Sequence, residues 1–383
     1  MISPKCLAVL TAGRQDYGIL RGIMLGMQES PQIDLRVWAG GMHLQERFGR
    51  TIANVLADGL PVTEELNFVS EPPDAAADAA RAVSAIVAAI RRNRPDALLL
   101  GGDRPEMLAA AMAATIERVP IAHLHGGEES EGAIDNALRH AITKLSHLHL
   151  VSHERHAQRV RQMGEPPETV VVVGAPGLDN RFRADLPDRA ALAASLGISL
   201  NDPVVIVTMH PTTLGFSDPA AETEAVAAAM ARVPATYVIT QPNADEGGIR
   251  IREFWLRWAA ERPNVALVDA LGELRYWGLL RIAAAVLGNS SSGIIEAPEA
   301  GVPGLNVGDR QRGRLRGRGV KDVLAEVTPV ENALRESLAS GAKESISTQP
   351  TTYLDGPAAP RVIAALNHWV LPTPPRKVFR DLA

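Results

Sequence analysis

Short runs of Val, Ile and Leu alternate along the first half of the chain with longer segments in which apolar residues recur every three or four positions. Uninterrupted apolar runs are typical of strands buried on both faces of a parallel sheet, and the longer spacing is typical of amphipathic helices. The pattern predicts strands at Cys6–Leu10, Leu35–Ala39, Ala97–Leu100, Ile121–Leu124, His149–Val151 and Val170–Val173. It predicts helices at Tyr17–Gln28, Leu44–Ala57, Ala75–Arg92, Pro105–Ile116, Ile134–Leu145 and Glu154–Met163. This order indicates a doubly wound, Rossmann-like α/β domain.

The same alternation restarts after a break in the middle of the chain. Turn residues at Gly174–Gly177 and the proline Pro187 mark the break. Beyond it the pattern predicts strands at Val204–Met209, Thr236–Thr240, Val265–Val268, Ala285–Leu287 and Gly304–Val307, and helices at Ala220–Arg232, Ile249–Arg262, Glu273–Ile282 and Ile294–Ala300. The sequence thus predicts two doubly wound domains, residues 1–180 and 181–355. A last apolar segment, Pro360–Trp369, predicts a helix within residues 356–383 that packs back on the first domain.

Composition and charge narrow the range of functions. The chain has 383 residues, of which 46% are hydrophobic, and it carries 39 basic and 44 acidic side chains, a net charge of −5. A general nucleic-acid-binding protein normally shows a basic excess. The single cysteine, Cys6, excludes an intramolecular disulfide, and the apolar run near Met1 is too short to cross a membrane. We therefore expect a cytoplasmic protein that binds neither nucleic acid nor membrane.

The residues that follow the predicted strands are candidates for chemistry, because ligands of open parallel sheets bind at the carboxyl ends of the strands. Two such sheets in tandem predict an active-site cleft between the domains. After the first strand, a glycine turn with Arg14 suits a phosphate, although an ordinary turn with a surface arginine explains it equally well. Asp103 and Arg104 follow Ala97–Leu100 and two glycines. The alternative for Asp103 is the N-cap of the next helix.

The segment 122–140 combines several histidines with four carboxylates and one arginine. His123 and His125 alternate about a predicted strand end, so we expect them on opposite sides. Asp135 and Arg139 are four residues apart on a predicted helix and share one face. Histidines and carboxylates are metal ligands, but no recognised ligand spacing appears, and we predict no metal site.

Polar residues also follow the strands of the second half. His210 comes directly after Val204–Met209, and Ser290–Ser292 follow Ala285–Leu287. The serine hydroxyls and the backbone N–H groups at the start of a helix can cradle a diphosphate. Glu296, one turn further on, can accept both hydroxyls of a ribose. The alternative for these residues is helix capping and a first-turn interaction with the helix dipole.

Two further segments of the second half carry candidate ligands. Asn243 lies in the turn that follows Thr236–Thr240. Arg310 and Arg314 belong to a glycine-bearing loop with three arginines after the last predicted strand. This loop suits a phosphate clamp. Contact with RNA is the alternative, and the acidic net charge disfavours it.

Taken together, these motifs resemble those of the hydrolysing UDP-N-acetylglucosamine 2-epimerases, in particular the bacterial branch that makes precursors of sialic-acid-type sugars. The matching residues run in order over nearly the whole chain. They are Arg14–Gly18, Gly40–Leu44, Gly102–Arg104, His125–Glu128, Gly132–Asp135, Arg139–His147, His210–Pro211, Pro242–Asp245, Asn289–Gly293, Glu296 and Arg310–Arg314. The resemblance implies a glycosyltransferase-B-like fold, in agreement with two doubly wound domains.

The resemblance also implies a reaction and a set of site residues. A base removes the C2 proton of the sugar while UDP leaves C1, and water adds to the resulting 2-acetamidoglucal. The implied product is free N-acetylmannosamine or a 2,4-diacetamido-6-deoxy analogue. The implied catalytic residues are Asp103, His125, Glu128, Asp135 and His210. The implied substrate-binding residues are Arg14, Arg104, Glu131, Arg139, Asn243, Ser290, Ser291, Ser292, Glu296, Arg310 and Arg314.

Three departures from the family pattern concern the sugar and its acid/base groups. Some relatives, including the animal enzyme, carry a glutamate where this chain has His125. A base role then falls to His125, since a histidine can take a proton near neutral pH, or to Glu128 or Glu131. Asn136 stands where an acid is often seen, and Arg275–Trp277 is bulkier than the corresponding segment of many relatives.

Three other functions are considered from the sequence. A glycosyltransferase of the same fold would transfer the sugar of a UDP-sugar to an acceptor, and a non-epimerising hydrolase would release it unchanged. A sugar-nucleotide-binding or regulatory protein without catalysis is disfavoured, because Asp103, Asp135 and His210 are all present. The dense carboxylates of residues 128–135 favour the epimerase. We expect a nucleotide-sugar substrate and no cofactor, and, by analogy with the family, a homodimer.

Overall fold

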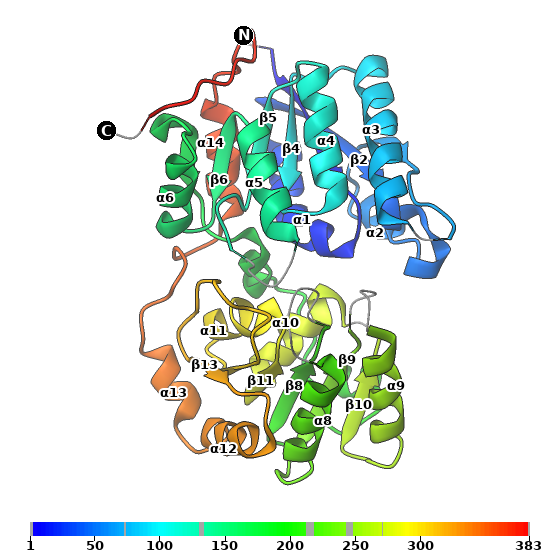
Figure 1. The fold of residues 1–383 in the computed structure, drawn as a ribbon, viewed down its shortest axis with the longest axis vertical. Coiled ribbons are helices and arrows are strands. Elements are labelled where there is room, and N and C mark those ends of the chain that lie inside the picture. Colours follow the sequence, from blue (N-terminus) through cyan, green and yellow to red (C-terminus); the bar gives the residue numbers. More distant parts are fainter. Residues whose placement is uncertain are drawn as a thin grey trace. The chain divides into compact units, whose positions relative to one another are not determined.

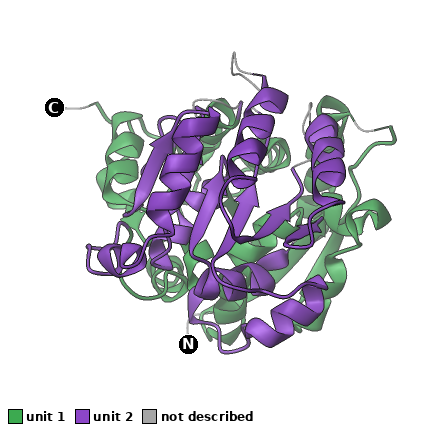
Figure 2. Ribbon diagram, turned by 90° about the horizontal axis from the view of Figure 1, so that it is seen from below, with its two compact units in different colours: residues 1–128, 135–179, 353–383 green, residues 129–134, 180–352 purple. Residues whose placement is uncertain are grey.

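The computed structural model describes residues 3–72, 74–129, 134–211, 218–242, 248–269 and 271–381. The chain forms two compact units, shown in different colours in Figure 2. Unit 1 consists of residues 1–128, 135–179 and 353–383, and unit 2 of residues 129–134 and 180–352. Among the helices of these described residues, none combines the length and the hydrophobicity that a membrane crossing requires.

Unit 1 is built on a seven-stranded parallel sheet with the order β3-β2-β1-β4-β5-β6-β7. Its strands β2, β4, β5 and β6 are labelled in Figure 1. Its strands are β1 (Lys5–Thr11), β2 (Ile33–Gly40), β3 (Val62–Leu66), β4 (Ala97–Gly101), β5 (Ile121–Leu124), β6 (Leu148–Val151) and β7 (Val170–Val172). Successive residues of β1 point into two different cores: Leu7 and Val9 into one, Ala8 and Leu10 into the other. Burial on both faces explains why these strands are continuous apolar runs.

In the part of the chain that the structure describes, seven α-helices accompany this sheet. They are α1 (Arg14–Glu29), α2 (Ile52–Ala57), α3 (Ala75–Arg92), α4 (Pro105–Ile116), α5 (Asp135–Leu145), α6 (Glu154–Gln162) and α14 (Ala359–His368). Helices α1 and α14 share one of the two cores, and α3, α4 and α5 contribute to the other. The sheet is therefore covered on both sides, as in a doubly wound fold.

Unit 2 repeats this plan with a six-stranded parallel sheet of order β10-β9-β8-β11-β12-β13. Its strands are β8 (Val204–Thr208), β9 (Thr236–Thr240), β10 (Val265–Val268), β11 (Ala285–Gly288), β12 (Gly304–Val307) and β13 (Val320–Val323). Its helices are α7 (Arg189–Leu196), α8 (Pro219–Met230), α9 (Gly248–Ala259), α10 (Gly272–Ile282), α11 (Glu296–Glu299), α12 (Val327–Ser337) and α13 (Ala342–Ser347). Side chains of β8, α9 and α12 meet in one hydrophobic core.

Helix α14 lies against α1, although the two are separated by more than three hundred residues. Gly26 of α1 makes this approach feasible, because a Cβ atom there would collide with Ile363. At the end of α14, the Lys5 Nζ of β1 donates hydrogen bonds to the carbonyl oxygens of Leu366, Asn367 and Trp369, at 3.0, 2.7 and 2.7 Å. The carbonyl groups at the carboxyl end of a helix have no hydrogen-bond donor within the helix. The Lys5 ammonium supplies donors to them and its positive charge interacts favourably with the helix dipole.

The structure differs from the predicted elements in two places of unit 1. The predicted helix Leu44–Ala57 is interrupted: Gly49 and Arg50 have φ angles of +81° and +42°, which no α-helix accommodates. Strand β3 was not predicted, because two glutamates stand within its five residues. One of them, Glu64, is buried and forms an ion pair with Arg92, at 2.6 Å.

Candidate functional site

The carboxyl edge of the unit 1 sheet brings together most of the residues predicted in the first half of the chain. Strands β1, β4, β5 and β6 are neighbours there, and Arg14, Asp103, His125 and Ser152 follow them. Arg14 is exposed at the first position of α1. The search for polar residues directly after predicted strands thus found groups that lie on one edge of one sheet.

Asp103 forms an ion pair with Arg139. The guanidinium is only 2% exposed, and its Nη1 also donates to the backbone oxygen of Glu128 at 2.9 Å and to Asn136 Oδ1 at 3.2 Å. The alternative interpretation of Asp103 as a helix cap is wrong, because the N-cap of α4 is Arg104 and no side chain caps that helix. Asp103 is therefore a carboxylate held at a strand end by a buried cation.

His125 stands one residue beyond β5, in a left-handed conformation with φ of +66°. We expected His123 and His125 on opposite sides because side chains alternate along a strand. That reasoning does not apply to His125, because β5 ends at Leu124. The His125 Nδ1 lies 2.8 Å from Glu128 Oε1. His123 is fully buried, with its Nε2 2.8 Å from the Gly102 oxygen, and burial lowers its pKa to about 3. His123 is thus a neutral structural residue, and the His125–Glu128 pair is the candidate for chemistry.

A second carboxylate cluster surrounds Arg104. Burial raises the pKa of Asp16 to about 7, and the neighbouring carboxylate of Glu106 adds to the rise. Arg104 opposes it; its Nε donates to Glu106 Oε1 at 2.7 Å, and its charge also interacts with Asp135. Asp16 was not among the predicted site residues, although it belongs to the Arg14–Gly18 motif.

In unit 2, Asn289 ties together the ends of β8 and β11. Its Oδ1 accepts from the backbone N–H of His210 at 2.7 Å, and its Nδ2 donates to the His210 oxygen at 2.9 Å. Gly288, with φ of +132°, allows this approach because a Cβ atom there would overlap the Thr208 carbonyl. Arg310 donates to the backbone oxygens of Asn289 and Pro211, at 3.2 and 3.3 Å. The predicted residues His210 and Arg310 are therefore brought together.

His210 is buried, and burial together with the charge of Arg310 lowers its pKa to about 3. The imidazole is therefore neutral at neutral pH. A neutral ring can donate or accept a hydrogen bond, but it adds no positive charge to a diphosphate. Arg310, which contacts the backbone of Pro211 and Asn289, is a cation that can supply this charge.

The serine run forms a short turn rather than the start of a long helix. Residues Ser291–Gly293 make one 3₁₀ turn, and the predicted helix Ile294–Ala300 is reduced to the four residues of α11. Ser290 caps the turn, since its Oγ accepts from the Ser292 N–H at 3.4 Å, so the capping alternative holds for Ser290. The turn offers hydroxyls and backbone N–H groups, but four residues supply little helix dipole.

Tyr276 of α10 extends this cluster. Burial and the charge of Glu296 raise the pKa of Tyr276 above its ordinary value, and its hydroxyl lies near Ser292. The sequence analysis noted Arg275–Trp277 only as unusually bulky. The Arg314 backbone oxygen accepts from Arg316 Nη1 at 2.9 Å within the arginine loop. Glu131 and Asn243 lie outside the described residues.

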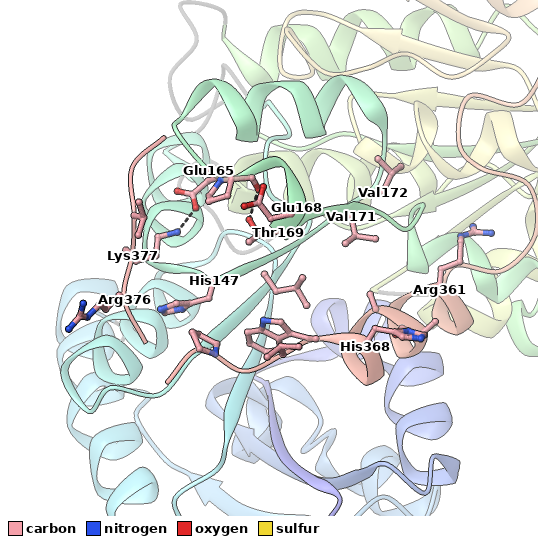
Figure 3. A pocket seen from close by; sticks show the side chains of 18 residues that line it. His147, Glu165, Glu168, Thr169, Val171, Val172, Arg361, His368, Arg376 and Lys377 are labelled. Atoms are coloured by element: carbon pink, nitrogen blue, oxygen red, sulfur yellow. Dashed lines mark hydrogen bonds and ion pairs between the residues drawn. The ribbon is translucent and has the colours of Figure 1, made fainter. Parts of the chain in front are cut away.

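A cavity of about 770 Å³ opens in unit 1 beside β6, β7 and α14, and none of the predicted site residues lines it (Figure 3). Glu165, 1% exposed, stands at its wall. The Glu165 carboxylate accepts from His149 Nε2 at 2.9 Å and Lys144 Nζ at 2.7 Å, and it forms an ion pair with Lys377. Burial alone would raise the pKa of Glu165, but these hydrogen bonds outweigh it and lower the pKa to about 2.

Within the described ranges, no group of three or more His, Cys, Asp or Glu side chains is arranged to hold a metal ion. The expectation of a metal-free reaction stays a prediction. The chemistry that the two clusters can perform is proton transfer, by His125 and the carboxylates of unit 1, and anion binding, by the polar turn and Arg310 of unit 2.

The family model described as UDP-N-acetylglucosamine 2-epimerase matches residues 26–367 of the chain. The chain belongs to the UDP-N-acetylglucosamine 2-epimerase family. Within it, the chain is 34% identical to the UDP-N,N'-diacetylbacillosamine 2-epimerase (hydrolyzing) of Legionella pneumophila, over 86% of this chain and 88% of that protein. It is 32% identical to the GDP/UDP-N,N'-diacetylbacillosamine 2-epimerase (hydrolyzing) of Campylobacter jejuni, over 88% of each. The resemblance to hydrolysing 2-epimerases is confirmed.

The fold of this 2-epimerase family member also has close counterparts among solved structures. The UDP-GlcNAc 2-epimerase from Neisseria meningitidis, solved bound to UDP-GlcNAc, superposes with a TM-score of 0.78 over 94% of this chain and 99% of that one, at 18% identity. The predicted fold class, two doubly wound α/β domains of the glycosyltransferase-B type, is confirmed.

Proposed function

We propose that this member of the 2-epimerase family is a hydrolysing 2-epimerase. It converts a UDP-N-acetylglucosamine-type sugar nucleotide and water to UDP and the free 2-epimer. Support comes from the hydrolysing relatives and from the carboxylates and His125 gathered at one edge of the unit 1 sheet. The comparisons do not favour a glycosyltransferase or a non-epimerising hydrolase. A cytoplasmic location and a homodimer stay predictions.

The first step is an elimination. The C2–H bond breaks and its electron pair forms the C1=C2 double bond, while the C1–O bond breaks and its pair leaves with UDP. In the second step water adds its oxygen to C1, and a proton is delivered to C2. Because C2 is inverted, the proton acceptor and the proton donor must lie on opposite faces of the sugar. We assign these roles to groups of unit 1: Asp103, Asp135 and His125.

The leaving UDP needs a different set of groups. Loss of a proton that no carbonyl activates is difficult, so stabilisation of the departing diphosphate lowers the barrier. We assign this role to unit 2, where Arg310 supplies charge and Ser290–Ser292 supply hydroxyl and N–H donors. Glu296 then accepts the ribose hydroxyls. Arg14 and Arg104 of unit 1 are further candidates for substrate contacts.

The proposed function is tested by incubating the protein with UDP-N-acetylglucosamine or UDP-N,N'-diacetylbacillosamine in deuterated water, without an acceptor. We expect UDP release and a 2-epimer that carries deuterium at C2, because the original proton is removed and a solvent proton replaces it. Nuclear magnetic resonance of the product reads both the configuration and the label. Release of a sugar without deuterium at C2 would exclude elimination, and release of no UDP would favour a transferase.

The nucleotide role of Glu296 gives a separate prediction. Replacing Glu296 with Ala removes one or two charge-assisted hydrogen bonds to the ribose, each contributing about 1.5–3 kcal/mol. UDP should therefore bind at least about tenfold more weakly in titration calorimetry. The control is Glu344→Ala, at an exposed carboxylate of α13 in the same unit. Equal UDP affinity in the Glu296 variant and the wild type would contradict the assignment.

A further inference from the structure

His125 is held in a conformation that a histidine rarely adopts. Its φ of +66° lies in the left-handed region, which costs a non-glycine residue free energy and is found mostly where function or packing imposes it. Gly127, two residues on, has φ of +76°, and a Cβ atom there would collide with the His156 backbone oxygen of α6. The turn after β5 is therefore pressed against the start of α6.

A chain of hydrogen bonds runs through this contact. His125 Nδ1 lies 2.8 Å from Glu128 Oε1, and the same oxygen accepts from Ser152 Oγ at 2.7 Å. Ser152 Oγ in turn lies 2.9 Å from His156 Nδ1. Ser152 and His156 are 1% and 3% exposed, so solvent does not compete for these bonds. The chain joins the ends of β5 and β6 with α6.

Donor and acceptor counting orients every bond in this chain. The ionised carboxylate of Glu128 can only accept, so both His125 Nδ1 and Ser152 Oγ donate to it. Ser152, having given its single hydrogen to Glu128, must accept from His156 Nδ1. Burial lowers the pKa of His156 to about 4, so this ring is neutral and carries its only proton on Nδ1. A neutral His125 then bears its proton on Nδ1 and a lone pair on Nε2.

The Nε2 of His125 is buried and has no hydrogen-bond partner among the described residues. We propose that His125 Nε2 is the base that takes the C2 proton, and that Glu128, Ser152 and His156 are positioning residues that fix its tautomer. The inference rests on the proposed function. In the elimination the proton moves from C2 to Nε2, and Glu128 balances the charge of the imidazolium so formed.

Among the described residues, the charged and titratable groups around this pair come from the three elements α5, α6 and β5. Arg139 of α5 donates to the Glu128 backbone oxygen. Arg159 of α6 contacts the Gly127 oxygen, and His156 belongs to the same helix. His123 of β5 interacts electrostatically with His125 and Glu128. His123 and His156 are both neutral at neutral pH and add no charge next to His125. The carboxylate that His125 contacts directly is that of Glu128.

The tautomer can be tested on the free protein. In ¹⁵N spectra of histidine-labelled protein, the signals of His125 are assigned by their loss in His125→Gln. We expect a protonated Nδ1 and an unprotonated Nε2 in the neutral ring, and Ser152→Ala should reduce that preference. A ring protonated on Nε2 would overturn the proposal. This measurement needs no turnover, so it stands even if the deuterium experiment refutes the 2-epimerase.

A double-mutant cycle tests the positioning role in catalysis. Groups that orient a metal-bound histidine from beyond its direct contacts are typically worth about 10-fold to 100-fold. We expect an effect of the same order at His125, so Ser152→Ala, which acts through Glu128, should lower kcat by about 10-fold to 100-fold and leave KM unchanged. In the background of His125→Gln, which has no tautomer to fix, the same change should cost much less. An equal loss in both backgrounds would show a merely structural role and overturn the proposal.

The base role itself is tested at His125. His125→Gln cannot take the C2 proton, so kcat should fall by at least about 100-fold, while UDP affinity should stay near that of the wild type because we assign the nucleotide-binding groups to unit 2. A kcat within a few-fold of the wild type would assign the base to another residue.

Discussion

Asp103→Asn should lower kcat by at least about 100-fold, because a positioned acid or base contributes about 10²–10⁴ in rate and an amide cannot take or give the proton. UDP affinity should stay near that of the wild type, since we assign the main nucleotide-binding groups to unit 2. Turnover is measured by UDP release and binding by titration calorimetry. The expected pattern is therefore a loss of kcat alone.

The matched control is Asp96→Asn, at the other end of the same strand. Asp96 is exposed and accepts from the Cys6 N–H at 2.8 Å, a bond that an amide oxygen can also accept. Because Asp103→Asn also removes the anion from the buried Arg139, the folded fraction is checked by circular dichroism. If the folded variant kept kcat within a few-fold of the wild type, Asp103 would be only the ion-pair partner of Arg139.

Glu165→Gln should weaken unit 1 by about 3 kcal/mol, because breaking a buried ion pair by removing one partner leaves the other group without its counter-charge. The change leaves the three partners His149, Lys144 and Lys377 without an anion. Hydrogen exchange of the β6 amides reports the opening of unit 1, and about 3 kcal/mol corresponds to a rise in exchange rate of about 100-fold. The control is Glu168→Gln. The Glu168 side chain is 66% exposed, so its ion pair with Arg380 should contribute less than about 1 kcal/mol.

The same carboxylate sets a pH dependence. The pKa of Glu165 in the folded protein is about 2, below the ordinary value near 4.3. Its contribution to stability is therefore present above the ordinary value and lost as the pH falls from there towards 2. The difference in β6 protection between wild type and Glu165→Gln should shrink over this range. A difference that stays constant would mean that the charge of Glu165 contributes nothing.

The parallel strands could be predicted from the sequence because their burial on both faces leaves an uninterrupted apolar run. The strands Ile121–Leu124 and Thr236–Thr240 have the predicted bounds. Strand β3 could not be found in this way, since Glu64 is buried only because Arg92, twenty-eight residues on, neutralises it. An ion pair between distant elements leaves no local pattern.

In the candidate site, too, some residues could be predicted from a local pattern and others depend on contacts between distant elements. Asp103, His125 and His210 could be found because each follows a strand, and Ser152 satisfies the same rule but was overlooked. His156 carries no such signal, as it lies on α6 and reaches the site only because Gly127 lets the β5 turn approach that helix. Arg139 was expected to share a face with Asp135, but its ion-pair partner is Asp103, which the tertiary fold brings to it.

The lysine cap and the glycine contact that join β1 and α1 to α14 have a consequence for biosynthesis. Unit 1 is assembled from stretches of chain that flank unit 2, so α14 is translated only after all of unit 2. At about 5–20 residues per second, the α1 face of the seven-stranded sheet waits for its last helix on the order of tens of seconds. During that interval the apolar side chains that share a core with Val362 and Leu366 lack these two partners. Slowing or hastening ribosomes within unit 2 would therefore change the folding yield of unit 1.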